Sequence, residues 1–163
     1  MNPVTPSRAM LLVALLLASA CAVQSAKPSR LFVLAPATDA SGARGAATNT
    51  VSAILVGPVT LPAYTDRTAI LTRAREGELI PQSAARWAEP LERNFARVLV
   101  ENLSTQLGTE RVAALGGVVA NPHHQVVVDV TEFVVADDGQ AWLTAYWQVL
   151  DDDGRTVLSS HKS

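Results

Sequence analysis

The stretch "RWAEPLERNFARVLVENLSTQLG" (Arg86–Gly108) decides the fold, because it holds the clearest periodic pattern in the 163-residue chain. Apolar side chains recur in it at spacings of three and four, which places them on one face of an α-helix. A glycine such as Gly108 ends a helix well, because it adopts left-handed backbone angles without strain. We therefore predict an amphipathic helix over residues 90–107. The apolar positions of this pattern are Trp87, which precedes the helix, and Leu91, Phe95, Val98, Leu99, Leu103 and Leu107.

The start of this helix has its own sequence signals. Pro90 suits the first helical position, where its missing N–H costs nothing. Glu89 is then the cap, and Glu92 is placed to reach back to the Glu89 N–H as in a capping box. Trp87 falls just outside the helix, where we expect it to cover the apolar face of the first turn.

The rest of the chain is mostly strand-like. Alternating or β-branched apolar runs predict strands over 31–34, 52–62, 68–73, 110–115, 125–133, 140–150 and 155–160, with a short hairpin return over 77–82. "DDG" (137–139) and "DDDG" (151–154) are turn signals, 35–50 is a predicted loop, and 116–124 is a turn-rich connection. We predict one α/β (α+β-like) domain over 31–163: a mixed, mostly antiparallel sheet with the helix packed on one face.

The N-terminus predicts export. Residues 1–20 combine one cation, Arg8, with an apolar run over 9–18 and small residues after it, which is typical of a secretory signal. The apolar run is shorter than the roughly 20 residues that span a bilayer. Residues 21–30 are small and polar, and we interpret them as a tether between the signal and the domain.

Cys21, the one cysteine of the chain, directly follows the signal in "LLLASAC". This resembles the lipobox of bacterial lipoproteins, although Ala18 stands where that box usually has leucine. The resemblance implies a diacylglycerol on the Cys21 sulfur and an acyl group on its amine. Ala22 is not the aspartate that retains such proteins at the inner membrane, so the inner leaflet of the outer membrane is implied. An ordinary soluble periplasmic protein with a free thiol is the alternative.

Composition and motifs argue against several classes of function. The net charge of −2 comes without any basic run, which argues against nucleic-acid binding. Common nucleophile, phosphate-loop and dinucleotide motifs are missing from the sequence. His123 and His124 are adjacent, but adjacent residues in an extended chain point to opposite sides. We predict no enzyme, no cofactor and no metal site. A hydrolase or metal-binding protein that uses His123, His124 and the turn carboxylates is the alternative.

Three segments together resemble a known family, the ABC-type transport auxiliary lipoproteins of the PqiC type. The pattern is L-P-x-Y-x-D-R, then R-W-A-x-P-L opening a helix that runs into E-N-L-S, then a V-x-V-x-x-F strand. It is matched within residues 56–73, 86–107 and 126–133. Among the matched residues, Tyr64, Arg67, Trp87 and Pro90 are candidates for structural or docking roles.

The resemblance implies a non-enzymatic role. Such lipoproteins sit at the periplasmic face of the outer membrane and join a periplasmic MCE-domain lipid-transport protein of an ABC-driven system. They support envelope integrity, and a ring-like homo-oligomer is implied as well. A lipoprotein of another outer-membrane assembly machine is a further alternative. Family members usually continue beyond the point where this sequence ends in "LSSHKS", so we interpret the domain as truncated and expect one sheet face to be poorly covered.

Overall fold

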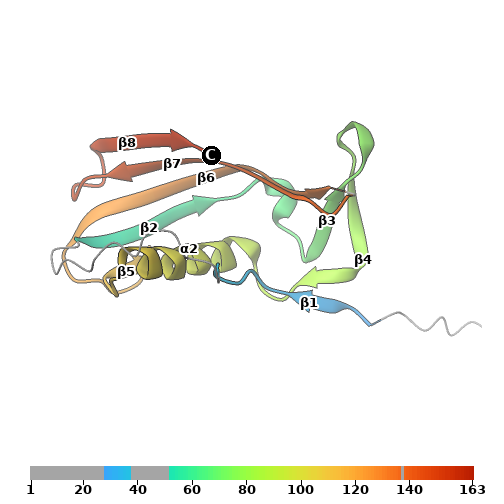
Figure 1. Ribbon diagram of the computed structural model, residues 1–163, viewed down its shortest axis with the longest axis horizontal. Coiled ribbons are helices and arrows are strands. Elements are labelled where there is room, and N and C mark those ends of the chain that lie inside the picture. The colour runs from blue at the N-terminus through green and yellow to red at the C-terminus, as the bar shows by residue number, and fades with distance from the viewer. Residues whose placement is uncertain (1–27, 38–51, 137) are drawn as a thin grey trace, which may run out of the picture.

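The computed structural model describes residues 28–37, 52–136 and 138–163 (Figure 1). Within them, eight strands form one mixed sheet, and an α-helix packs on it, so the predicted single-domain α+β fold is confirmed. In chain order the elements are β1 (Arg30–Phe32), β2 (Ala53–Thr60), β3 (Ala69–Arg73), β4 (Leu79–Trp87), α2 (Leu91–Leu107), β5 (Val112–Ala114), β6 (Pro122–Ala136), β7 (Ala141–Leu150) and β8 (Val157–Lys162). Short 3₁₀ turns occupy Ala63–Thr65 and Arg75–Gly77.

Strand β6 is the axis of the sheet and runs along most of the molecule (Figure 1). On one side it pairs antiparallel with β7 from Gln125 to Val135, and β8 continues the sheet beyond β7. On its other side it pairs parallel first with β2 and then, at Val135 and Ala136, with β3. Between these two neighbours β6 has a gap in its ladder.

The predicted alternation along β6 is confirmed in its central part. Val128 and Val130 are buried, whereas Asp129 and Thr131 are exposed. An irregularity after Val130 shifts the register against β7. Phe133, beyond that shift, packs against the core that the helix covers. The buried core consists of Val56, Val59, Val112, Val128, Val130 and Ala145.

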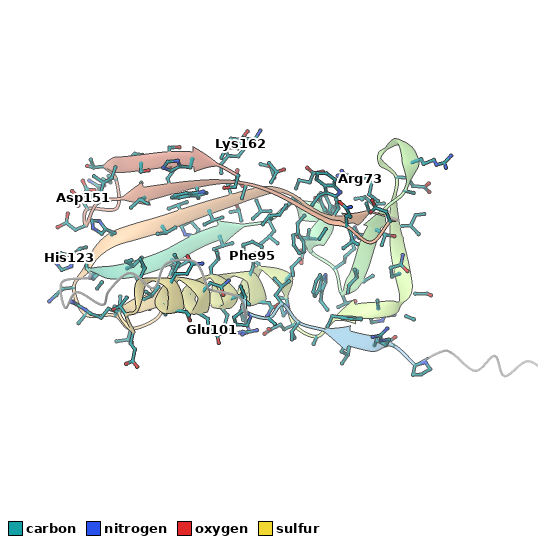
Figure 2. All side chains as sticks on the ribbon, in the orientation of Figure 1. Arg73, Phe95, Glu101, His123, Asp151 and Lys162 are labelled. Atoms are coloured by element: carbon teal, nitrogen blue, oxygen red, sulfur yellow. The ribbon has the colours of Figure 1, made fainter. Side chains whose placement is uncertain are left out.

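Helix α2 buries the predicted face. Leu91 is 5% exposed, and Phe95, Leu99 and Leu103 pack against the core, with Phe95 between helix and sheet in Figure 2. Gly108 ends the helix at φ 63° and ψ 36°, the left-handed conformation expected of it.

The helix begins one residue later than predicted. Pro90 is the cap rather than the first helical residue, because its ψ of 124° is extended while its carbonyl accepts the Asn94 N–H at 3.1 Å. Glu89 is therefore not the cap. Its carboxylate instead accepts the Asn94 side-chain amide at 2.5 Å. The expected capping box is wrong as well, since Glu92 forms no bond to the Glu89 N–H among the described residues.

Strands β4 and β6 extend beyond their predicted bounds because of neighbours that the sequence does not reveal, and β8 ends at Lys162, two residues later than predicted. β4 runs to Trp87 instead of stopping at residue 82, because its last three residues pair parallel with β1. Strand β6 begins at Pro122, where it pairs with β2. His123 and His124 therefore lie in a strand and not in the predicted loop.

The two C-terminal turns form as predicted around glycines with positive φ, Gly139 at 84° and Gly154 at 64°. In the second turn the Asp153 carboxylate accepts the backbone N–H groups of Thr156 and Arg155, which lowers the pKa of Asp153. The strands around these turns expose apolar side chains on both faces of the sheet, since adjacent residues of β7 such as Trp142 and Leu143 point to opposite sides. The exposed side chains are Trp142, Leu143, Tyr146, Val157 and Leu158.

Asn94 is a buried polar side chain, 1% exposed, and its amide joins the N-terminal segment to the helix. The Asn94 carbonyl oxygen accepts the Leu34 N–H at 2.5 Å, and its amide nitrogen donates to the Glu89 carboxylate. Two turns further along α2, the Asn102 side chain accepts the Ala37 N–H at 3.0 Å. The chain leaving β1 is thus held along the helix at two points.

We expect Asn94→Ala to lower the free energy of unfolding by about 3 kcal/mol, because it leaves the part-buried Leu34 N–H without its acceptor and removes one donor from the Glu89 carboxylate. Urea unfolding measures this change. Asn102→Ala is the matched control, since its bond is exposed, and should cost less than about 1 kcal/mol. Equal losses for the two variants would contradict the role given to Asn94.

Candidate functional site

The two stretches that open the family pattern, 61–67 and 86–91, are about twenty residues apart in sequence but meet in the fold. They surround a pocket of about 610 Å³, which we call the signature pocket. One wall comes from the turn that follows β2, and the other from the end of β4 and the first turn of α2. The lining residues are 61–63, 65–68 and 87–92.

Tyr64 has a structural role behind this pocket. It lies on the 3₁₀ turn Ala63–Thr65, and its hydroxyl accepts the Phe133 N–H at 3.0 Å. That N–H belongs to the part of β6 between its pairings with β2 and β3. Tyr64 thus supplies an acceptor where the strand ladder has none.

Trp87 lies at the end of β4, just before the helix as predicted, and is half-buried. Its ring centroid lies 6.3 Å from that of Phe133, which meets Phe95 edge-on at 6.1 Å. Trp87 also donates its backbone N–H to Thr68 at 2.7 Å, which joins the two walls of the signature pocket. The indole therefore packs against Phe133 and also lines the signature pocket.

Arg86 and Pro90 fix the second wall. The Arg86 guanidinium donates to the Ser29 and Thr68 hydroxyls, each at 3.3 Å. Pro90 holds an extended ψ at the cap, which turns the chain from β4 into α2. Glu89, beside it, is held by Asn94 and by Arg97 at 3.4 Å.

Arg67 is a residue of the family pattern whose side chain makes no hydrogen bond or ion pair with the described residues. It is exposed at the signature pocket, and its guanidinium pairs with no carboxylate of the described chain. The same pocket also carries the carboxylates of Asp66, Glu89 and Glu92, beside apolar walls from Leu61 and Trp87. Glu89 is bound by Asn94 and Arg97, whereas Asp66 and Glu92 have no cationic partner among the described residues. An apolar centre with a polar, solvent-accessible rim is typical of a protein-binding surface.

The histidines do not form a site. His123 is exposed and His124 partly buried, so the two adjacent residues of β6 face opposite sides of the sheet. Figure 2 places His123 at the same end of the molecule as Asp151. Within the described residues, no three His, Cys, Asp or Glu side chains gather as metal ligands.

Two other polar pairs lie on strands of the sheet, outside the signature pocket. His161 stacks on Trp147 at 4.5 Å and lies 2.5 Å from the Ser159 hydroxyl, but all of this is on the exposed strand β8 and its neighbour. At the opposite end of the sheet, Arg73 binds Glu132, and this contact lowers the pKa of that carboxyl. Both pairs are consistent with surface contacts of a sheet.

Sequence reasoning missed Asn94, which it left unremarked within an apolar helix face. An amide among apolar neighbours at helical spacing was the available signal. Cys21, the predicted lipid-attachment residue, lies outside the described residues. No helix among the described residues combines the length and apolar composition that crossing a membrane requires.

Comparison with known proteins identifies the family. Residues 32–163 match the family model described as "ABC-type transport auxiliary lipoprotein component". The crystal structure of protein XCC0632 from Xanthomonas campestris, of family DUF330, is similar with a TM-score of 0.67 and 18% identity, covering 83% of this chain and 75% of that one. A crystal structure of an uncharacterized protein is similar with a TM-score of 0.62 and 20% identity, covering 84% and 76%. No curated protein matches the chain.

We expect Trp87→Ala to lower the free energy of unfolding by about 3 kcal/mol, the low end for a buried tryptophan, because Trp87 is half-buried against Phe133. Thermal or urea unfolding measures the loss. Trp142→Ala is the control, since Trp142 is 54% exposed, and it should change stability by no more than about 0.5 kcal/mol. A wild-type midpoint for Trp87→Ala would mean that this ring serves docking alone.

Proposed function

The chain belongs to the ABC-type transport auxiliary lipoprotein family, and from this premise we propose that it is a lipid-anchored, non-catalytic docking subunit of an intermembrane lipid transport system. The observation that carries the proposal is the family match over residues 32–163, which spans nearly all of the described domain. The convergence of two family stretches on the signature pocket supports a role in docking.

The anchor of the proposal is Cys21. A diacylglycerol and an N-acyl group there give the several chains that stable membrane attachment needs. Strand β1 begins at Arg30, nine residues later, and a tether of that length reaches at most about 30 Å. The domain would then work close to the periplasmic face of the outer membrane.

The docking surface of the proposal is the signature pocket, and its occupant is a periplasmic MCE-domain transport protein. Tyr64, Trp87 and Pro90 have structural explanations, whereas Arg67 has none within the described chain. Arg67 is therefore free to pair with a carboxylate of the partner protein. Asp66 and Glu92 can in turn pair with cationic side chains of that partner. Several copies in a ring around the end of a transport tunnel would repeat this contact and support envelope integrity.

We expect Arg67→Glu to reduce recovery of the MCE-domain partner about tenfold in crosslinking and co-purification from envelopes, because it replaces an attractive charge with a repulsive one. Arg155→Glu, an exposed arginine on the β7–β8 turn, is the matched control and should leave recovery unchanged. Equal recovery for both variants would exclude the signature pocket as the docking surface. Failure of the wild type to recover an MCE-domain protein would overturn the partner itself.

The anchor has a separate test. The intact mass of protein extracted from membranes should equal that of the chain from Cys21 onward carrying three acyl chains, and Cys21→Ala should appear in the soluble periplasmic fraction. Density-gradient separation of inner and outer membranes should place the wild type with the outer membrane. An unmodified thiol at position 21, or Cys21→Ala that stays in the membrane, would contradict the anchor.

A further inference from the structure

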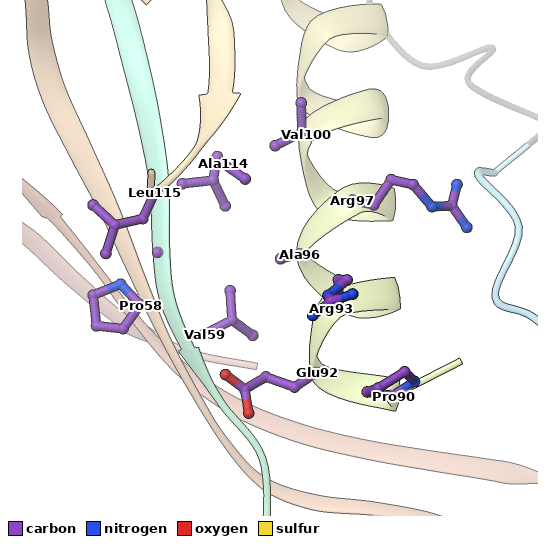
Figure 3. Close-up of a pocket in the computed structure, with 12 residues that line it drawn as sticks. Pro58, Val59, Pro90, Glu92, Arg93, Ala96, Arg97, Val100, Ala114 and Leu115 are labelled. Carbon is purple, nitrogen blue, oxygen red and sulfur yellow. The ribbon is translucent and has the colours of Figure 1, made fainter. Parts of the chain in front are cut away.

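A second pocket of about 610 Å³ opens between α2 and the strands β2 and β5, and we call it the helix–sheet pocket (Figure 3). It shares only Pro90 and Glu92 with the lining of the signature pocket. The docking role proposed above makes no use of it. Its volume lies in the range of sites that hold small ligands.

Small residues on both walls leave this space open. Ala96 on the helix faces β2 and β5, and Ala114 lines the strand side (Figure 3). Val56 and Val59, 1% and 5% exposed, close it on the β2 side. Between Ala96, Ala114 and these valines the walls consist of methyl and methylene groups, which suit an apolar chain, whereas the charged side chains of the lining belong to α2.

The positive charges at the rim of this pocket are electrostatically unfavourable for helix α2. Arg93 lies in the first turn of α2, where the helix dipole disfavours a cation. Arg97 follows at i+4, and like charges at that spacing are unfavourable as well. Arg97 points away from the strands and contacts Glu89, Glu101 and Leu34 (Figure 3). Arg93 has no carboxylate partner among the described residues.

Glu92 is also at the rim and points toward β2, beside Val59 (Figure 3). It would repel an anion at that position. An anionic group is favoured at Arg93 and not at Glu92, because Arg93 has no carboxylate partner among the described residues, and an apolar chain is favoured between Ala96 and β2. A molecule that carries both an apolar chain and an anionic group would meet both requirements.

We propose that the helix–sheet pocket binds a single-chain amphiphile with an anionic headgroup. Its chain lies between Ala96, Val59 and Ala114, and its headgroup accepts hydrogen bonds from the Arg93 guanidinium. The site does not depend on the docking partner or on the lipid anchor. Phosphate and carboxylate headgroups share the chemistry that Arg93 recognises.

The test is calorimetric titration of the full chain carrying Cys21→Ala with three probes: dodecyl phosphate, dodecan-1-ol and inorganic phosphate, each below the concentration at which it aggregates. Dodecyl phosphate should bind saturably with one molecule per chain. Dodecan-1-ol should bind about tenfold more weakly, because it lacks the charge-assisted hydrogen bond. Inorganic phosphate, a headgroup without a chain, should not bind measurably.

Two variants separate the chain contact from the headgroup contact. Ala96→Trp fills the pocket and should weaken both dodecyl probes at least about tenfold, whereas Ala141→Trp, on exposed β7, should not. Arg93→Gln should weaken dodecyl phosphate about tenfold and leave dodecan-1-ol unchanged, whereas Arg155→Gln should change neither. Arg93 and Arg155 are exposed, so these variants remain informative if Ala96→Trp unfolds.

Three results would overturn the proposal. The first is no saturable binding of dodecyl phosphate to the parent chain. The second is unchanged binding in a folded Ala96→Trp variant, which would place the chain elsewhere. The third is equal loss of both dodecyl probes, or of neither, in Arg93→Gln, which would remove the headgroup contact.

Discussion

The hydrogen bonds of the buried Asn94 amide are the constraint on which the arrangement of this fold depends. A buried amide is costly unless both its oxygen and its nitrogen are paired. Asn94 meets this condition with the Leu34 N–H on one side and the Glu89 carboxylate on the other. One side chain therefore fixes where the N-terminal segment lies, how β4 turns into α2, and where Glu89 stands. Both pockets are built around that same first turn of α2.

The long strand β6 provides the second constraint, because it pairs with three other strands and leaves a gap between two of them. Tyr64 fills that gap with its hydroxyl, and Trp87 packs against the Phe133 ring next to it. Tyr64 and Trp87 therefore have structural roles within the fold. Arg67 is different, since it stands at the same pocket with no partner in the described chain. Arg67 is therefore the residue of this pocket on which the proposed docking contact rests.

Much of the fold could be predicted from the sequence, because the relevant signals are local. The periodicity from Leu91 to Leu107, the glycine after it, the alternation around Val128 and the aspartate–glycine turns each determine their own element. What could not be predicted depends on distant partners. β4 continues to Trp87 because β1, more than fifty residues earlier, pairs with it, and His124 joins β6 because Ile54 lies beside it. The role of Asn94 and both pockets arise in the same way, from segments that meet only in the folded chain.

The central claim is that the signature pocket is the surface through which this lipoprotein meets its transport partner. The most direct measurement is hydrogen exchange of the wild-type protein with and without the MCE-domain protein bound. The account predicts slower exchange on binding in residues 61–68 and 86–92, with β7 and β8 unchanged. Protection confined to β7 and β8, where Trp142 and Leu158 are exposed, with the signature pocket unaffected, would contradict it.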